Sequence, residues 1–210
     1  LGFKAGEATL RFETVPGGVK ISTRAESAPW ISIFYRVDDR AESIILRGTD
    51  GEGNTVWYPK SYHLKIREGR HRRDKEVIFS ERGRHALFID HLKGERKEYD
   101  LPPGTFDPLS GFFLLRGVDL VPGKSVISRI FDSKKVWDVQ VKVLRTEKID
   151  TYMGERRTVV VKPELKSEGI FLRKGDVFIF LTDDDRKLPL LLKTRVLVGS
   201  VLAELRGGRF

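Results

Sequence analysis

The chain contains no cysteine and only one methionine among its 210 residues. Without thiols it can form no disulfide, no thiolate metal site and no thiol nucleophile, and its redox compartment stays open. No stretch reaches the roughly 18 apolar residues that a membrane-spanning helix needs. Glycines stand singly in turns rather than in phosphate-binding loops, and no Gly-x-Ser-x-Gly nucleophile elbow occurs. We therefore expect a non-enzymatic protein that needs no cofactor and does not span a membrane.

The composition is that of a folded, basic protein. Apolar residues make up 40% and charged residues 33%, which is enough for a core and argues against disorder. Lysine and arginine exceed the acidic residues and give a net charge of +9. Such an excess favours anionic partners such as lipid headgroups, although it is also common in proteins without them.

Apolar and polar residues alternate along much of the chain. Residues 7–13 and 19–26 alternate on either side of Pro16-Gly17-Gly18, which predicts a β-hairpin with one solvated face. The same period recurs at 62–67 and 137–143. About a dozen such runs are separated by turn signals, which is typical of a barrel or a sandwich.

The last third of the chain repeats this pattern. Two apolar runs flank the turn around Asp183-Asp184-Asp185, and a third run extends from Arg195 to Leu205. They predict a meander of antiparallel strands. With no long linker or repeat, residues 1–210 are predicted to form a single all-β domain, a curled antiparallel sheet or a barrel.

One segment breaks the alternation. Asp107, Pro108 and Gly117 have the residue types of an N-cap, a first helical residue and a C-terminal stop, so a short helix is predicted over about 108–116. A second short helix is predicted at 31–36. The body of the first helix is apolar on nearly every side, so we expect it to be buried.

A barrel of a dozen strands leaves a lumen that must be filled or occupied. The apolar helix is therefore a candidate plug or ligand-cavity wall. The candidate ligand-binding residues are Phe112, Phe113, Leu115 and Trp137.

Several segments, taken in order and spacing, resemble a family of exported bacterial proteins described only as a domain of unknown function, number three-one-zero-eight. The segments that carry the resemblance are Gly6-Glu7-Ala8, Ser32-Ile33-Phe34-Tyr35-Arg36-Val37, Glu68-Gly69-Arg70-His71-Arg72-Arg73-Asp74, Asp107-Pro108-Leu109-Ser110, Lys134, Val136-Trp137, Gly169-Ile170-Phe171, Leu181-Thr182-Asp183-Asp184-Asp185-Arg186-Lys187-Leu188-Pro189 and Val198-Gly199-Ser200-Val201-Leu202-Ala203-Glu204-Leu205. The resemblance implies a signal peptide removed upstream of Leu1 and a periplasmic or exported location. A truncated sequence would explain the missing initiator methionine equally well. It also implies a curled sheet similar to the lipoprotein carriers that hold acyl chains, and it transfers no catalytic residue.

A basic run is the strongest local charge feature. Arg67, Arg70, Arg72 and Arg73 are candidate anion-binding residues, since guanidinium groups bind phosphate and carboxylate in a bidentate manner. Alternatively, the charges protect an edge hairpin from aggregation. Nucleic acid is not expected as a partner, because aromatic residues do not interleave with the basic ones.

Metal binding is not expected. The consecutive acids Asp183 to Asp185 lack the spacing of a calcium loop. No pair of histidines has helical metal spacing, although His85 and His91 would share a face if one strand continued through both. A zinc site would need histidines and carboxylates from separate strands.

Three functions remain open from the sequence. The first is an envelope protein that binds a lipid, lipopeptide or glycolipid in the concavity of the sheet. The second is a module that contacts an envelope protein or peptidoglycan through its basic surface. The third, with no motif to support it, is a hydrolase acting on an envelope polymer.

Overall fold

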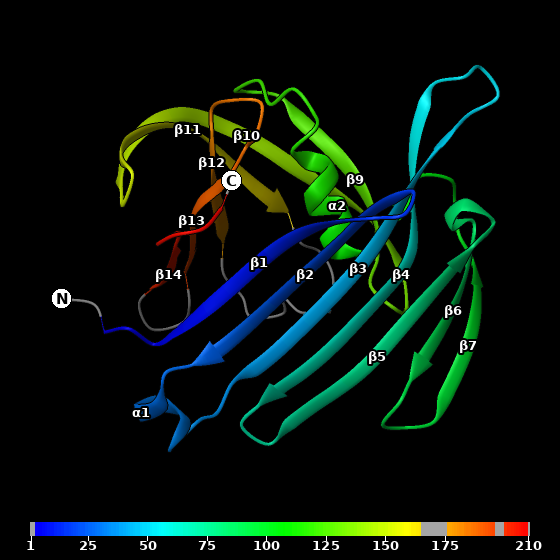
Figure 1. Ribbon diagram of the computed structural model, residues 1–210, viewed down its shortest axis with the longest axis horizontal. Helices are drawn as coiled ribbons and strands as arrows, with labels where there is room; N and C mark the ends of the chain where they lie inside the picture. The colour runs from blue at the N-terminus through cyan, green and yellow to red at the C-terminus, as the bar shows by residue number, and fades with distance from the viewer. Residues whose placement is uncertain (1–2, 165–175, 196–199, 210) are drawn as a thin grey trace. The chain divides into compact units, whose positions relative to one another are not determined.

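The computed structural model describes residues 3–164, 176–195 and 200–209. Strands dominate these residues and form two antiparallel seven-stranded sheets (Figure 1). Within them, neither sheet closes on itself, so the all-β prediction is confirmed in its curled-sheet form. The motif residues 169–171, 198 and 199 lie outside the described residues.

The first sheet follows chain order, so each strand pairs with the next through a hairpin or a short connection. Its strands are β1 (Gly6–Val15), β2 (Gly18–Ser27), β3 (Asp38–Thr49), β4 (Thr55–Glu68), β5 (His71–Ser80), β6 (His85–Asp90) and β7 (Glu95–Asp100). The predicted hairpin is confirmed, with Leu10 opposite Thr23 and Phe12 opposite Ile21. Gly17 turns the chain at a φ of 73°, which glycine adopts readily.

The second sheet has the order β14-β13-β12-β11-β10-β9-β8. Its strands are β8 (Thr105–Phe106), β9 (Ser125–Phe131), β10 (Val136–Thr151), β11 (Gly154–Glu164), β12 (Val177–Thr182), β13 (Pro189–Arg195) and β14 (Ser200–Glu204). Strands β12, β13 and β14 form the predicted antiparallel meander. On β10, Val139, Val141 and Val143 are buried, as the alternation predicts.

Three short helical segments interrupt the strands: α1 (Pro29–Ser32), the 3-10 turn η1 (Glu81–Gly83) and α2 (Pro108–Leu115). Helix α2 is the helix predicted over 108–116. Helix α1 is shorter than the predicted 31–36 helix and begins earlier, because Pro29 supplies a preset φ at the start of the turn.

The chain divides into two compact units. One contains the residues up to Gly111 together with Ile130–Val136, and the other contains Phe112–Arg129 and the residues from Trp137 onward. The prediction of a single domain stays a prediction.

The core of the first unit lies on one face of its sheet. It is formed by every second residue of the central strands, together with two residues from outside them: Ala41, Tyr62, Leu64, Ile66, Val77, Phe79, Ala86, Phe88, Leu101 and Phe131. The rings of Tyr99 and Phe131 meet edge to face, with centroids 5.1 Å apart. This alternation places the polar residues of β4 and β5 on the opposite face.

Candidate amphipathic surface

A short segment between β2 and β3 is built as an isolated turn of helix. The carbonyl of Ala28 accepts the N–H groups of Ile31 and Ser32 at 3.0 and 2.9 Å, and the carbonyl of Ile31 accepts the N–H of Tyr35 at 2.7 Å. Residues 30–36 contribute to no strand, so their side chains are not held in a sheet face.

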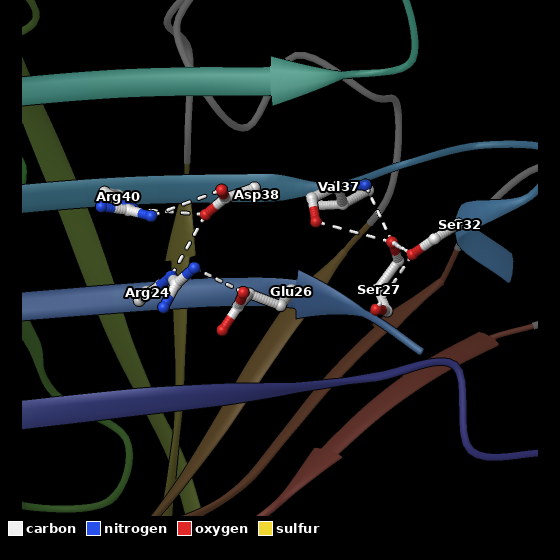
Figure 2. Close-up of polar contacts among 7 residues, drawn as sticks. All are labelled: Arg24, Glu26, Ser27, Ser32, Val37, Asp38 and Arg40. Atoms are coloured by element: carbon white, nitrogen blue, oxygen red, sulfur yellow. Dashed lines mark hydrogen bonds and ion pairs between the residues drawn. The ribbon is translucent and has the colours of Figure 1, made fainter. Parts of the chain in front are cut away.

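Serine side chains tie this segment to the ends of β2 and β3 (Figure 2). The Ser27 hydroxyl accepts the Val37 N–H at 2.9 Å, while the Ser27 N–H donates to the Val37 carbonyl at 3.0 Å. The hydroxyls of Ser27 and Ser32 are 2.7 Å apart. The helical turn is therefore fixed by hydrogen bonds of Ser27 and Ser32, and residues 33–36, which follow it, are exposed.

The acidic side chains at the adjoining ends of β2 and β3 form ion pairs with arginines (Figure 2). Asp38 contacts Arg40 and Arg24, each at 3.2 Å, and Arg24 also pairs with Glu26 at 2.5 Å. The hydrogen bond from Arg40, joined by that from Arg24, holds the pKa of Asp38 below its ordinary value despite partial burial. Asp38 therefore stays charged and keeps the two arginines in place.

Four large side chains of this segment are exposed and form what we call the apolar tip: Trp30, Ile33, Phe34 and Tyr35. Ile33 is 77% and Phe34 is 86% exposed. The indole N–H of Trp30 donates to the Lys4 carbonyl at 3.1 Å, and the exposed ring of Phe3 meets Trp30 edge-on. Neighbouring exposed apolar side chains mark interaction surfaces, unlike the single ones scattered over any protein.

The turn between β4 and β5 lies directly beside the apolar tip. The Gly69 N–H donates to the Arg36 carbonyl at 2.8 Å, and Val37 forms an isolated bridge with Glu68. Gly69 has a φ of 55°, and a Cβ at this position would lie 2.7 Å from Cε2 of Tyr35. Only glycine allows both this turn and the close approach of the ring.

The basic residues predicted to act together fall on two faces of the sheet. Arg67 and Arg72 are opposite each other in the β4–β5 register, and both are exposed, as is Arg70 in the turn. Arg73 pairs with the buried Ile66, so it points to the other face and is half-buried. We call the exposed set Arg36, Arg67, Arg70 and Arg72 the basic rim.

In the basic rim, Arg72 is held by backbone carbonyls, and the other three arginines have no acidic partner among the described residues. The Arg72 guanidinium donates to the carbonyls of Gly69 and His71, each at 2.7 Å. Among the described residues, Arg36, Arg67 and Arg70 form no ion pair with an acidic side chain. The explanation by edge protection is wrong, because β4 and β5 lie inside the sheet order. The positive charge therefore needs another explanation.

The residues predicted to line a ligand cavity are less exposed. Leu115 is buried, and Phe112, Phe113 and Trp137 are half-buried. The Arg116 guanidinium lies 6.0 Å from the centre of the Phe113 ring and donates to the Arg186 carbonyl. Their role in a ligand cavity stays a prediction.

The N-terminus of α2 contains a buried polar cluster. One carboxylate oxygen of Asp107 accepts the N–H groups of Leu109 and Ser110, and the other accepts the hydroxyls of Ser43 and Ser110 at 2.8 and 2.5 Å. Burial raises the pKa of Asp107, against the opposing effect of these hydrogen bonds. The predicted N-cap is confirmed, and its sealed position makes it structural.

The buried side chain of Tyr62 interacts electrostatically with Asp107 of this cluster. Burial, followed by the charge of Asp107, raises the pKa of Tyr62. Its hydroxyl is buried and has no hydrogen-bond partner among the described residues. The sequence pointed to the cap but not to Ser43 or Tyr62, whose approach depends on strand packing.

The acidic triplet after β12 forms a turn. One carboxylate oxygen of Asp184 accepts the Thr182 hydroxyl at 2.6 Å and the N–H groups of Arg186 and Lys187. Asp183 pairs with Arg157 at 2.7 Å. These contacts are those of a side-chain-closed turn with a local ion pair.

Comparisons with known proteins show a similar fold in one solved structure and identify the family of the chain. Its fold is similar to that of a β-barrel-like protein of the domain of unknown function DUF1849 from Brucella abortus, with a TM-score of 0.55 and 13% identity over 95% of this chain and 86% of that one. The model of the family "Protein of unknown function (DUF3108)" matches residues 1–206, so the chain belongs to this family and the resemblance is confirmed. No curated protein matches the chain. Among the described residues, no helix is both long and apolar enough to cross a bilayer.

Proposed function

We propose that this protein is a non-enzymatic component of the bacterial cell envelope that binds an anionic lipid surface. The apolar tip enters the acyl layer and the basic rim contacts the headgroup phosphates. One observation carries this proposal: four exposed large apolar side chains stand beside four exposed arginines at the same end of one sheet.

The chemistry of the two parts is complementary to a lipid interface. Tryptophan and tyrosine favour the headgroup level of a membrane, while isoleucine and phenylalanine favour its apolar interior. Guanidinium groups bind phosphate oxygens in a bidentate manner. A peripheral protein that combines an apolar insertion with basic residues binds anionic lipid reversibly.

The magnitudes fit reversible binding. Burial of Ile33 and Phe34 contributes about 3–6 kcal/mol in total. Each arginine near an anionic surface adds about 1 kcal/mol. After the cost of immobilising the protein, this sum supports weak to moderate affinity and falls far short of a permanent anchor.

The envelope location rests on the exported family that the sequence resembles, and anionic lipid is available there. A non-enzymatic role is supported by the burial of Asp107, Ser43 and Ser110, which places this polar cluster out of reach of a substrate. The alternative module, which contacts an envelope protein or peptidoglycan, would use the same basic rim. That alternative has no need of the apolar tip.

Co-sedimentation with vesicles tests the proposal. The wild-type chain is expected to sediment with vesicles of phosphatidylethanolamine and phosphatidylglycerol, and much less with vesicles of phosphatidylcholine alone. The double variant Ile33→Ser, Phe34→Ser is expected to lose about hundredfold or more in affinity, because about 3–6 kcal/mol of burial is removed.

The matched control is Ile78→Thr, an exposed apolar residue far along β5 from the turn. It should bind as the wild type does. Equal binding by the double variant and the wild type would overturn the proposal. Binding to peptidoglycan by both proteins, without vesicle binding, would support the alternative module instead.

A further inference from the structure

Two histidines and two carboxylates meet on the solvated face of the first sheet. Nε2 of His63 lies 2.7 Å from Oδ1 of Asp74, and Nε2 of His91 lies 2.9 Å from Oε2 of Glu76. The rings of His63 and His91 are neighbours, with centroids 5.6 Å apart. One ligand atom from each of His63, Asp74 and His91 lies within 4.8 Å of the others.

Three segments of the sheet hold these side chains. His63 on β4 is directly opposite Glu76 on β5, and Asp74 lies two residues along on the same face. The turn after β6 brings in His91, whose N–H donates to the Asp74 carbonyl at 2.8 Å. Asp90 fixes that turn by accepting the N–H groups of Leu92 and Lys93. The cluster is therefore positioned by the β4–β5 pairing and by the hydrogen bond that ties His91 to Asp74.

Three of these side chains, His63, Asp74 and His91, are those of a zinc site. Imidazole nitrogens and carboxylate oxygens bind Zn²⁺ in a tetrahedron, and no cysteine is required. Ligand atoms around a tetrahedral zinc stand about 3.3–3.5 Å apart, given bonds of about 2.0–2.2 Å. The observed separations bracket this value, so small side-chain rotations would admit an ion.

Metal binding would replace a hydrogen bond that is already present. Nε2 of His63 faces a carboxylate oxygen of Asp74, so binding of the ion would break this hydrogen bond, release its proton and widen the N–O separation from 2.7 Å. Lys65 lies 3.4 Å from the other oxygen of Asp74, where it can support the carboxylate without occupying the ligand position.

We infer that His63, Asp74 and His91 form a Zn²⁺ site on the outer face of the first sheet, with Glu76 beside His91. Three protein ligands leave the fourth position of the tetrahedron to water. The ion joins the turn between β6 and β7 to the β4–β5 hairpin, which also carries the basic rim. This inference is independent of the lipid proposal.

Isothermal titration calorimetry of the tag-free chain with ZnCl₂ tests the inference. We expect one saturable equivalent of zinc and a zinc-dependent rise in the Tm. The variants His63→Ala and His91→Ala should each weaken binding about tenfold or more, because each removes one of three ligands. Titration with Co²⁺ should give the visible absorption of a tetrahedral site.

His85→Ala is the matched control, since His85 lies on the same sheet and contacts Asp100 rather than the cluster. It should bind zinc as the wild type does. Circular dichroism without metal checks that each variant folds, and His63→Gln serves if His63→Ala does not. No saturable binding to the wild type would overturn the inference, as would equal affinity in the folded His63 and His91 variants.

Discussion

At the scale of single residues, Asp107 shows what a local motif can and cannot reveal. Its role as N-cap is visible in the sequence, because the groups it accepts belong to the next three residues. Its bond to Ser43 spans 64 residues and depends on how β3 packs against the start of α2. A cap at this position predicts a helix start, whereas burial of the carboxyl can be known only from the fold.

The burial of Asp107 predicts an unusual dependence of stability on pH. Its pKa is raised in the native state, so between the ordinary aspartate pKa and the raised one the native state holds the proton that the unfolded state has lost. This group therefore makes the protein less stable as pH rises through that window, by up to about 1.4 kcal/mol per pH unit. Urea denaturation at a series of pH values measures the effect.

Asp107→Asn should remove this contribution, so the difference in unfolding free energy between wild type and variant should shift against the wild type as pH increases. Asp50→Asn is a useful control, because hydrogen bonds from Asn54 lower the pKa of Asp50 and its effect has the opposite sign. A constant difference between wild type and Asp107→Asn across the window would contradict the raised pKa.

At the scale of elements, period-two alternation predicted strands because strands such as β3, β4 and β10 have one buried and one solvated face. It predicted the β1–β2 hairpin with its turn. The apolar tip escaped notice because its apolar residues follow no period, although Pro29 and the crowding of large side chains after it were a usable signal. The split between Arg72 and Arg73 follows from alternation alone.

The histidine cluster was beyond sequence reasoning. His63, Asp74 and His91 come from two strands and a turn, and only the register of β4 against β5 brings them together. From the sequence, His85 and His91 would share a face only if one strand continued through both residues. That strand ends at Asp90, and the two side chains have different partners.

The contact between Gly69 and Tyr35 predicts that the hairpin and the apolar tip are coupled. Gly69→Ala should cost about 1–2 kcal/mol from its left-handed backbone, and more because its Cβ would collide with the Tyr35 ring. Urea denaturation measures the loss. The control is Gly17→Ala, which also has a positive φ but has no atom within 4 Å of the added Cβ. Equal losses in both variants would mean that the Tyr35 contact has no energetic weight.

At the scale of the whole molecule, a net charge of +9 does not identify a partner by itself. Its meaning comes from local placement, since Asp38 and Glu26 near the tip are ion-paired with Arg24 and Arg40 rather than with the basic rim. The basic rim then faces solvent next to apolar side chains. The resemblance to the family pointed to the fold. The hypothesis of lipid binding comes from the apolar tip and the basic rim.

This arrangement predicts lipid binding that depends on salt and on which arginine is changed. Arg67→Glu with Arg70→Glu should weaken binding to anionic vesicles by at least about thirtyfold, at about 1 kcal/mol for each positive charge removed. Arg73→Glu should have a smaller effect, because Arg73 lies on the other face. Added salt should weaken wild-type binding, since the screening length is about 10 Å at 0.1 M. Identical losses from both changes would contradict the division between the faces.

The most direct test is to observe the apolar tip at the lipid. The chain has no cysteine, so Phe34→Cys gives a single site for an environment-sensitive fluorophore. With phosphatidylglycerol-containing vesicles, the account predicts a blue shift and protection from an aqueous quencher at position 34. The same label at Ile78→Cys should show neither. If the protein binds the vesicles while the label at position 34 stays as exposed as the label at 78, the apolar tip does not enter the membrane and the central claim is wrong.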